Sequence, residues 1–148
     1  MRSRWPTPND LIDVDRLVAR TVEVVQIPSV NPFDEPMGEG EGAAAAWLNG
    51  HLERLGHEIA AEWIFGGRSN VIGVGLGGDG DVVCMAGHLD TVGVVDYDNP
   101  FSGEVRDGRV HGRGICDIKG ALAAFVEVAD ILADSDTNLN GRLMWAGF

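Results

Sequence analysis

An apolar run that ends abruptly in polar residues constrains the fold of this chain more than any other feature. Residues 81–86, Asp-Val-Val-Cys-Met-Ala, form a nearly continuous apolar segment of strand length. Such a run is typical of a central strand that is covered on both faces. Gly87-His88-Leu89-Asp90-Thr91 follows directly. Because ligands bind at the carboxyl ends of strands in α/β sheets, we expect functional residues at this point.

Segments with helical spacing lie on both sides of that strand. Asp13 is placed to cap the first helix, and Gly56 follows the end of the second. The segment 29–42 carries prolines, glycines and acids, which indicates a loop. Apolar residues recur at helical spacing over 13–26, 44–55 and 118–132.

Further strands complete the predicted sheet. Short runs of strand character occupy 58–64, 70–76 and 143–148. Asp107-Gly108 is a strong two-residue turn sequence and predicts a hairpin around it. Helices alternating with strands in a chain of 148 residues predict an α/β domain with a mixed central sheet flanked by helices.

Charge and composition exclude several classes of function. The chain has 11 Lys and Arg against 23 Asp and Glu, a net charge of −12, which argues against a nucleic-acid partner. No apolar run approaches the roughly 20 residues that cross a bilayer, and Met1–Pro6 lacks the apolar stretch of a signal peptide. We therefore expect a cytoplasmic protein with no membrane partner. Cys84 and Cys116 form no C-x-x-C pair, and we expect two buried thiols.

One glycine-rich segment resembles a nucleotide-binding fingerprint. Residues 73–78 satisfy G-x-G-x-x-G, but Asp79-Gly80 and an apolar strand follow them. The fingerprint requires a helix to begin at the last glycine, so that the helix N-terminus can hold a pyrophosphate. We interpret the segment as a hairpin turn and reject a nucleotide-binding domain.

His88 and Asp90 are the first candidate functional pair. They are two residues apart, so in extended backbone their side chains point to the same face. A carboxylate that accepts a hydrogen bond from one imidazole nitrogen makes the other nitrogen a better metal ligand. The tripeptide alone also fits a surface histidine beside a loop aspartate.

Asp117 lies in a second candidate segment, Gly112-Arg113-Gly114-Ile115-Cys116-Asp117-Ile118-Lys119-Gly120. It is placed to cap the helix that follows, which is the simplest interpretation. A carboxylate on a rigid, glycine-flanked turn can also bridge two metal ions. Lys119 is poorly placed for the helix dipole, which leaves open an anionic partner or an ordinary solvated lysine.

Together these segments resemble the M20 metallopeptidase and aminoacylase family, of the acetylornithine deacetylase, succinyl-diaminopimelate desuccinylase and glutamate carboxypeptidase type. The resemblance rests on G-H-L-D-T at 87–91, on Asn-Pro-Phe at 99–101 and on D-G-R-V-H-G-R-G-I-C-D-I-K-G at 107–120. Ile-Pro-Ser-Val-Asn-Pro at 27–32 is similar to the family's segment after its first helix. The similarity runs from about residue 14 to the last residue.

The resemblance implies a metal-dependent hydrolase that cleaves an amide bond, as an N-deacylase (a deacetylase, for example) or an exopeptidase. His88 then matches a metal ligand, Asp117 the aspartate that bridges two metal ions, and Asp90 the catalytic carboxylate that orients His88. The resemblance implies two divalent ions, zinc first and cobalt or manganese as alternatives. It also implies a zinc-exopeptidase-like domain, an N-acyl amino acid or peptide substrate, and a full-length relative that can form a homodimer.

The chain departs from the family in what it lacks. The family's general-base glutamate belongs to a Glu-Glu pair after a strand of the type at 143–148, and we find no such pair. We therefore expect residues 1–148 to be the N-terminal part of the catalytic domain, without the lid and dimerisation domain. Such a fragment would be inactive alone. The alternative is a non-catalytic module that keeps the fold with an incomplete metal site.

The remaining acids and histidines receive no metal-binding role. We expect Glu127 and Asp130 to lie on the solvated face of the third helix. For the histidines His51, His57 and His111, surface or satisfied-core positions are expected.

Overall fold

The computed structural model of the chain describes residues 8–64, 68–75, 77–135 and 139–148. The Met1–Pro6 segment on which the signal-peptide prediction rests lies outside these residues. The helices are α1 (Pro8–Leu11), α2 (Val14–Val25), α3 (Gly42–Arg54) and α4 (Gly120–Ala133), with a short helical segment η1 (Ile115–Lys119) before α4. The strands are β1 (Glu58–Trp63), β2 (Ser69–Val74), β3 (Val82–Gly87), β4 (Glu104–Arg106), β5 (Arg109–His111) and β6 (Arg142–Gly147).

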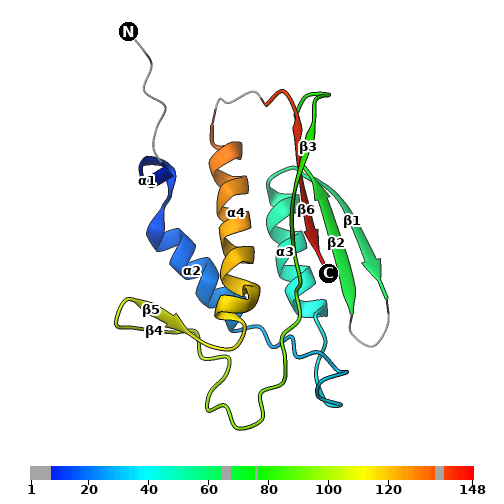
Figure 1. The fold of residues 1–148 in the computed structure, drawn as a ribbon. Coiled ribbons are helices and arrows are strands. Elements are labelled where there is room, and N and C mark those ends of the chain that lie inside the picture. Colours follow the sequence, from blue (N-terminus) through cyan, green and yellow to red (C-terminus); the bar gives the residue numbers. More distant parts are fainter. Residues whose placement is uncertain (1–7, 65–67, 76, 136–138) are drawn as a thin grey trace.

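Four strands form a mixed sheet in the order β1-β2-β6-β3. β1 pairs antiparallel with β2, and β2 antiparallel with β6, whereas β6 runs parallel to β3. Helix α3 packs on β1 and β2, and α4 packs on β3 and on α3. Figure 1 shows α3 and α4 on the same face of the sheet, with α2 outside α4. The predicted mixed α/β fold is confirmed.

The hydrophobic core lies between that face of the sheet and the helices. Its largest fully buried side chain is Trp145 of β6, 1% exposed. Leu48 and Leu52 of α3 and Leu122 and Val126 of α4 pack in the same cluster. Burying such side chains is the main favourable term in folding, at roughly 25 cal/mol per Å² of apolar surface. The core therefore fixes how β6 and β3 lie relative to α4.

Local sequence explains the helix start and the hairpin. Asp13 caps α2, because its Oδ1 accepts a hydrogen bond of 3.0 Å from the Arg16 backbone N–H. Asp107 (φ 53°) and Gly108 (φ 70°) adopt the left-handed backbone of a two-residue turn between β4 and β5. Both features were predicted from the residue types.

The strand predicted to be central lies at an edge. In the part of the chain that the structure describes, β3 pairs with β6 alone, and Val82 and Val83 are 56% and 59% exposed. Cys84 is exposed with them, and Cys116 is exposed on η1, so the prediction of two buried thiols is wrong. Apolar composition predicts burial only where other elements cover the strand, and α4 covers little of β3.

The glycine-rich segment is not a hairpin turn. Strand β6 lies between β2 and β3, so the segment joins strands that are not neighbours. The backbone N–H groups of Gly78 and Gly80 donate to the carbonyls of Leu139 and Asn140, which precede β6. Strand β3 rather than a helix follows, which agrees with rejecting a nucleotide fingerprint; Leu76 lies outside the described residues.

Glu127 and Asp130 are not on a solvated face. They are 2% and 8% exposed, because α2 packs across this side of α4. Glu127 accepts from Arg16 Nη2 at 2.7 Å and from Arg20 Nη1 at 2.6 Å. Arg20 also pairs with Asp130. The helical pattern placed these acids opposite the apolar stripe but did not show that a second helix covers them. Over the described residues, no helix combines the length and apolar character needed to cross a membrane.

Candidate metal centre

The first candidate site residues, His88 and Asp90, lie where β3 ends. Leu89 is fully buried in the core, so the alternation of extended backbone turns His88 and Asp90 away from it. The Leu89 N–H donates to the Phe148 carbonyl at 2.7 Å, and the Thr91 N–H donates to the Ser29 carbonyl at 2.8 Å. The segment is thus held by β6 on one side and by the loop after α2 on the other.

His88 lies between two carboxylates. Its Nδ1 is 3.1 Å from Asp90 Oδ1 and 3.0 Å from the Asp90 carbonyl. Its Nε2 is 2.9 Å from Asp117 Oδ1. Because both ring nitrogens face acceptor oxygens, both donate when the ring is charged, and Nε2 is the nitrogen directed to Asp117. The structure therefore brings all three predicted site residues together.

The ionisation of His88 reflects these neighbours. Burial disfavours the charged imidazolium, but the hydrogen bond to Asp117 and the interactions with Asp90 outweigh it. The pKa of His88 is therefore raised above its usual value. A divalent ion would take the place of the proton at Nε2, since both are held by the same lone pair.

Asp117 is not the helix cap that its position suggested. Its backbone (φ −139°, ψ 83°) is not helical, and the residue before α4 is Lys119, which makes no side-chain cap. The Asp117–Ile118 peptide bond is cis. The Asp117 side chain is 80% exposed and turns to His88 instead of to the helix. Gly114 (φ 81°) opens this turn, and its carbonyl accepts from the N–H groups of Asp117 and Lys119.

Lys119 is neither a solvated lysine nor paired with an anionic group among the described residues. It is 1% exposed, and its Nζ donates a hydrogen bond to the Ile27 carbonyl. The same Nζ lies 5.3 Å from the centre of the Phe101 ring. Burial lowers the pKa of Lys119 to about 8. This contact ties the turn that carries Asp117 to the segment after α2.

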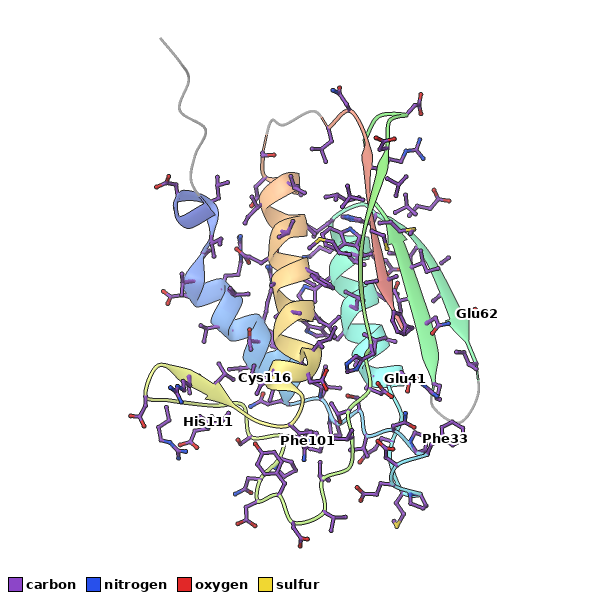
Figure 2. The ribbon with its side chains drawn as sticks, viewed as in Figure 1. Phe33, Glu41, Glu62, Phe101, His111 and Cys116 are labelled. Carbon is purple, nitrogen blue, oxygen red and sulfur yellow. The ribbon has the colours of Figure 1, made fainter. Side chains whose placement is uncertain are left out.

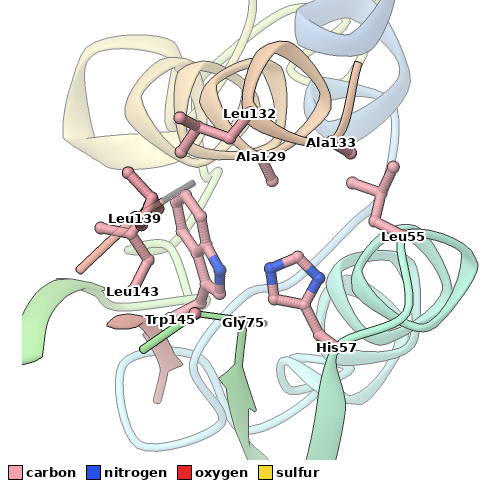
Figure 3. Close-up of a pocket in the computed structure, with 10 residues that line it drawn as sticks. Leu55, His57, Gly75, Ala129, Leu132, Ala133, Leu139, Leu143 and Trp145 are labelled. Carbon is pink, nitrogen blue, oxygen red and sulfur yellow. The ribbon is translucent and has the colours of Figure 1, made fainter. Parts of the chain in front are cut away.

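A cavity of about 220 Å³ opens at these residues. His88, Asp90 and Asp117 line it together with Asp34, Arg113 and Cys116. Figure 2 places Cys116 at the end of the molecule where β3 and β6 terminate. A cavity of similar size, about 240 Å³, is lined mainly by apolar residues around Trp145 and His57 (Figure 3). No carboxylate is among the described residues that line it, so the candidate centre is the first cavity.

The donor atoms fit a divalent ion only in part. An imidazole oriented by a carboxylate, beside a second exposed carboxylate, is a suitable pair of ligands for zinc or a similar ion. Zinc sites usually take three or four protein ligands. Within the described residues, no group of three or more His, Cys, Asp or Glu side chains could hold a metal ion.

Sequence reasoning missed one residue of this site. Asn31 donates from Nδ2 to Asp90 Oδ2 at 2.6 Å, and its own N–H donates to the Thr91 carbonyl at 2.8 Å. It lies in the Ile-Pro-Ser-Val-Asn-Pro segment, which the sequence had marked only as similar to the family. An amide in a loop gives no pattern by itself, and the contact depends on the isolated bridge between Val30 and Thr91.

The other histidines lie apart from the centre. The ring of His51 contacts Arg54 Nη2 at 2.9 Å. His57 packs against Trp145 with ring centroids 5.9 Å apart, and burial lowers its pKa. The ring of His111, on β5, has its Nε2 buried. None of them joins a metal-binding group within the described part of the chain.

Residues 84–148 match the sequence model of Peptidase family M20/M25/M40, a segment that includes His88, Asp90 and Asp117. Over residues 84–148 the chain is thus similar to the M20 peptidases. It is 34% identical over 127 residues to the succinyl-diaminopimelate desuccinylase of Gluconacetobacter diazotrophicus, covering 82% of this chain and 31% of that protein. The chain thus spans about a third of the length of this curated relative.

Solved structures show the same fold. The M20 family metallo-carboxypeptidase Sso-CP2 from Sulfolobus solfataricus superposes with a TM-score of 0.72 at 22% identity, over 90% of this chain and 30% of that one. Human carnosine dipeptidase 1 superposes with a TM-score of 0.71 at 21% identity, over 90% of this chain and 31% of that one. The chain therefore shares the fold of these enzymes over nearly all of its length.

Proposed function

We propose that this chain is the N-terminal part of the catalytic domain of a metal-dependent hydrolase that cleaves an amide bond. The observation that carries the proposal is the convergence of His88, Asp90 and Asp117 at the end of β3. The match of residues 84–148 to the M20 family supports it. The names of the relatives favour an N-acyl amino acid or a peptide as substrate.

Each of the three residues has a separate role in this proposal. Asp90 accepts a hydrogen bond from the Nδ1–H group of His88 and so directs Nε2 into the cavity. His88 Nε2 and the carboxylate of Asp117 are the ligands for divalent metal, with zinc first and cobalt or manganese as alternatives. The bound metal supplies Lewis acidity, which activates water and polarises an amide carbonyl. Asp90 acts through His88 and holds it in the tautomer that metal binding requires.

The described residues hold only part of the site. Because no group of three ligands is found among them, we expect the 148-residue chain alone to bind metal weakly and to lack hydrolase activity. This observation also favours the alternative of a non-catalytic module with an incomplete metal site. A cytoplasmic location and a homodimeric full-length relative remain predictions.

Metal binding by the purified chain tests the proposed ligands. We expect Co²⁺ titration to give a weak, saturable visible absorption band that is lost in His88→Gln and in Asp117→Asn. His111→Gln is the matched control, because it removes a histidine on β5, and should bind like the wild type. Equal binding by all four chains would contradict the assignment.

The downstream gene sequence and the activity of its product distinguish the enzyme proposal from a non-catalytic module. If the nucleotide sequence after the Phe148 codon encodes a Glu-Glu pair within a few residues and about 200 further residues, the enzyme proposal predicts hydrolysis of N-acyl amino acids by the longer product. Clear zinc- or cobalt-dependent hydrolysis by the 148-residue chain would instead overturn the expectation that it is inactive alone.

A further inference from the structure

A buried ion pair lies behind the candidate metal centre. Glu41, the residue before α3, is 0% exposed, and its Oε1 accepts a hydrogen bond of 2.8 Å from Arg68 Nε. Arg68, just before β2, has its Nη2 4.0 Å from Asp90 Oδ2. Glu41, Arg68 and Asp90 come from three separate segments, so only the folded chain brings them together.

A fully buried glutamate is costly unless its charge is compensated. The side chain of Glu41 makes no cap hydrogen bond to α3, although the residue lies at the cap position. Arg68 is the partner that the structure gives to Glu41 within the described residues. The buried carboxylate of Glu41 therefore binds the guanidinium of Arg68 and does not cap the helix.

The guanidinium is held on a second side by an aromatic ring. Arg68 lies over Phe33, with its Cζ 5.8 Å from the ring centroid. Figure 2 shows Phe33 and Glu41 at the same end of the molecule as the candidate centre. A cation placed between a carboxylate and an aromatic face has few alternative positions. The position of Arg68 beside Asp90 is thus fixed from outside the centre.

The two carboxylate oxygens of Asp90 have separate surroundings. Oδ1 faces His88 Nδ1, whereas Oδ2 accepts from Asn31 and lies nearest to Arg68. An interaction at Oδ2 therefore orients the carboxylate without competing for His88.

We propose that Glu41 and Arg68 are positioning residues of the candidate centre: they place a positive charge behind Asp90 and thereby fix His88 with Nδ1 protonated and Nε2 free for metal. The inference rests on the proposed function, because it concerns the same ligand. Glu41, before α3, and Arg68, before β2, are not metal ligands in this proposal and act on His88 through Asp90.

The test uses the full chain with Arg68→Gln, which keeps an amide donor for Glu41 but removes the charge. Arg68→Lys restores the charge, and Arg142→Gln removes an exposed arginine that pairs with Asp79 at the opposite end of the sheet. Two properties are measured. One is the tautomer of His88 from its ring ¹⁵N chemical shifts in the metal-free chain, at a pH where the ring is neutral. The other is Co²⁺ affinity by titration.

We expect Arg68→Gln to lower Co²⁺ affinity by about tenfold or more and to shift His88 toward the Nε2-protonated tautomer. Arg68→Lys should recover most of both properties, and Arg142→Gln should match the wild type. If Arg68→Gln fails to fold, the isosteric Glu41→Gln is measured in its place, with a change in the same direction. An unchanged His88 tautomer in a folded Arg68→Gln chain, or equal behaviour of Arg68→Gln and Arg68→Lys, overturns the proposal.

The two readouts separate this inference from the proposed function. If the wild type binds no Co²⁺, the proposed ligands are wrong, and the tautomer alone still decides the role of Arg68. If the wild type binds Co²⁺ and the His88 tautomer is insensitive to Arg68, the proposed function stands and the positioning role is rejected.

Discussion

At the scale of single residues, glycines decide whether the turn carrying Asp117 can form. Gly114 adopts φ 81°, and a Cβ there would lie 2.7 Å from Thr91 Cγ2 and 3.1 Å from Lys119 Cδ. Thr91 is buried and β-branched, so its methyl group has little room to move. Gly108 adopts a similar φ of 70° at the hairpin tip, where a Cβ would meet nothing within 4 Å. The two positions therefore separate backbone strain from crowding.

We predict that Gly114→Ala destabilises the chain more than Gly108→Ala does. The left-handed backbone should cost each variant about 1–2 kcal/mol. Crowding against Thr91 should add about 1–3 kcal/mol to the cost of Gly114→Ala alone. Free energies of unfolding from urea denaturation check this. Equal losses in the two variants would show that the turn around Asp117 tolerates a side chain.

At the scale of elements, the contact between α2 and α4 depends on buried charge. Glu127 of α4 accepts hydrogen bonds from Arg16 and Arg20 of α2, and its side chain is 3% exposed. Burial alone would raise the pKa of Glu127, but the hydrogen bond and charge of Arg16 and the charge of Arg20 lower it overall. The helix α2 precedes the segment that contacts Asp90 and Lys119, so this contact also supports the site.

We predict that Glu127→Gln lowers the free energy of unfolding at pH 7 by roughly 3 kcal/mol, since it removes the buried carboxylate that Arg16 and Arg20 share and leaves Arg20 with Asp130 alone. Because the folded-state pKa lies below the ordinary value of 4.5, the stabilising effect is complete above that pH. It is lost as the pH falls below about 4.5 and through the folded-state pKa. The difference between wild type and variant should therefore narrow in acid.

Glu104→Gln is the matched control, because Glu104 pairs with Arg106 on the exposed hairpin. Its effect should stay within about 0.5 kcal/mol at both pH values. Urea denaturation of the three chains at pH 7 and in acid gives all the differences. A loss for Glu127→Gln that does not change with pH would contradict the assigned role of its charge.

At the scale of the whole molecule, the sheet ends in an apolar edge. In the described structure no strand pairs with the outer side of β3, and Val82 and Val83 are exposed on it. An unpaired, apolar edge strand is a template for pairing with another chain. The solved M20 relatives are about three times as long as the matched region, which covers 30% of Sso-CP2.

We predict that the 148-residue chain self-associates through β3 at about 100 μM, and that Val83→Lys reduces the association. Val95→Lys is the matched control, because Val95 is 73% exposed in a loop away from the strand edges. Sedimentation velocity distinguishes the species. A wild type that stays monomeric, or a control that acts like Val83→Lys, would contradict the prediction.

Much of the fold followed from local sequence. Helical spacing, the Asp13 cap and the Asp107-Gly108 turn act over a few residues, and the structure confirms them. The candidate ligands His88 and Asp117 and the orienting carboxylate Asp90 were also identified from motifs, since their residue types and order are visible in the chain.

Tertiary structure alone decided what surrounds these residues. The edge position of β3, the burial of Glu127 and Asp130, and the buried lysine at position 119 all depend on which element covers which. Asn31 and Arg68 approach Asp90 from distant segments, and Glu41 pairs with Arg68 from a third, and no local pattern records such contacts. The sequence by itself determined the elements and the residue types of the site, because these depend on neighbouring residues. The supports of the site depend on packing between distant segments, which only the folded chain defines.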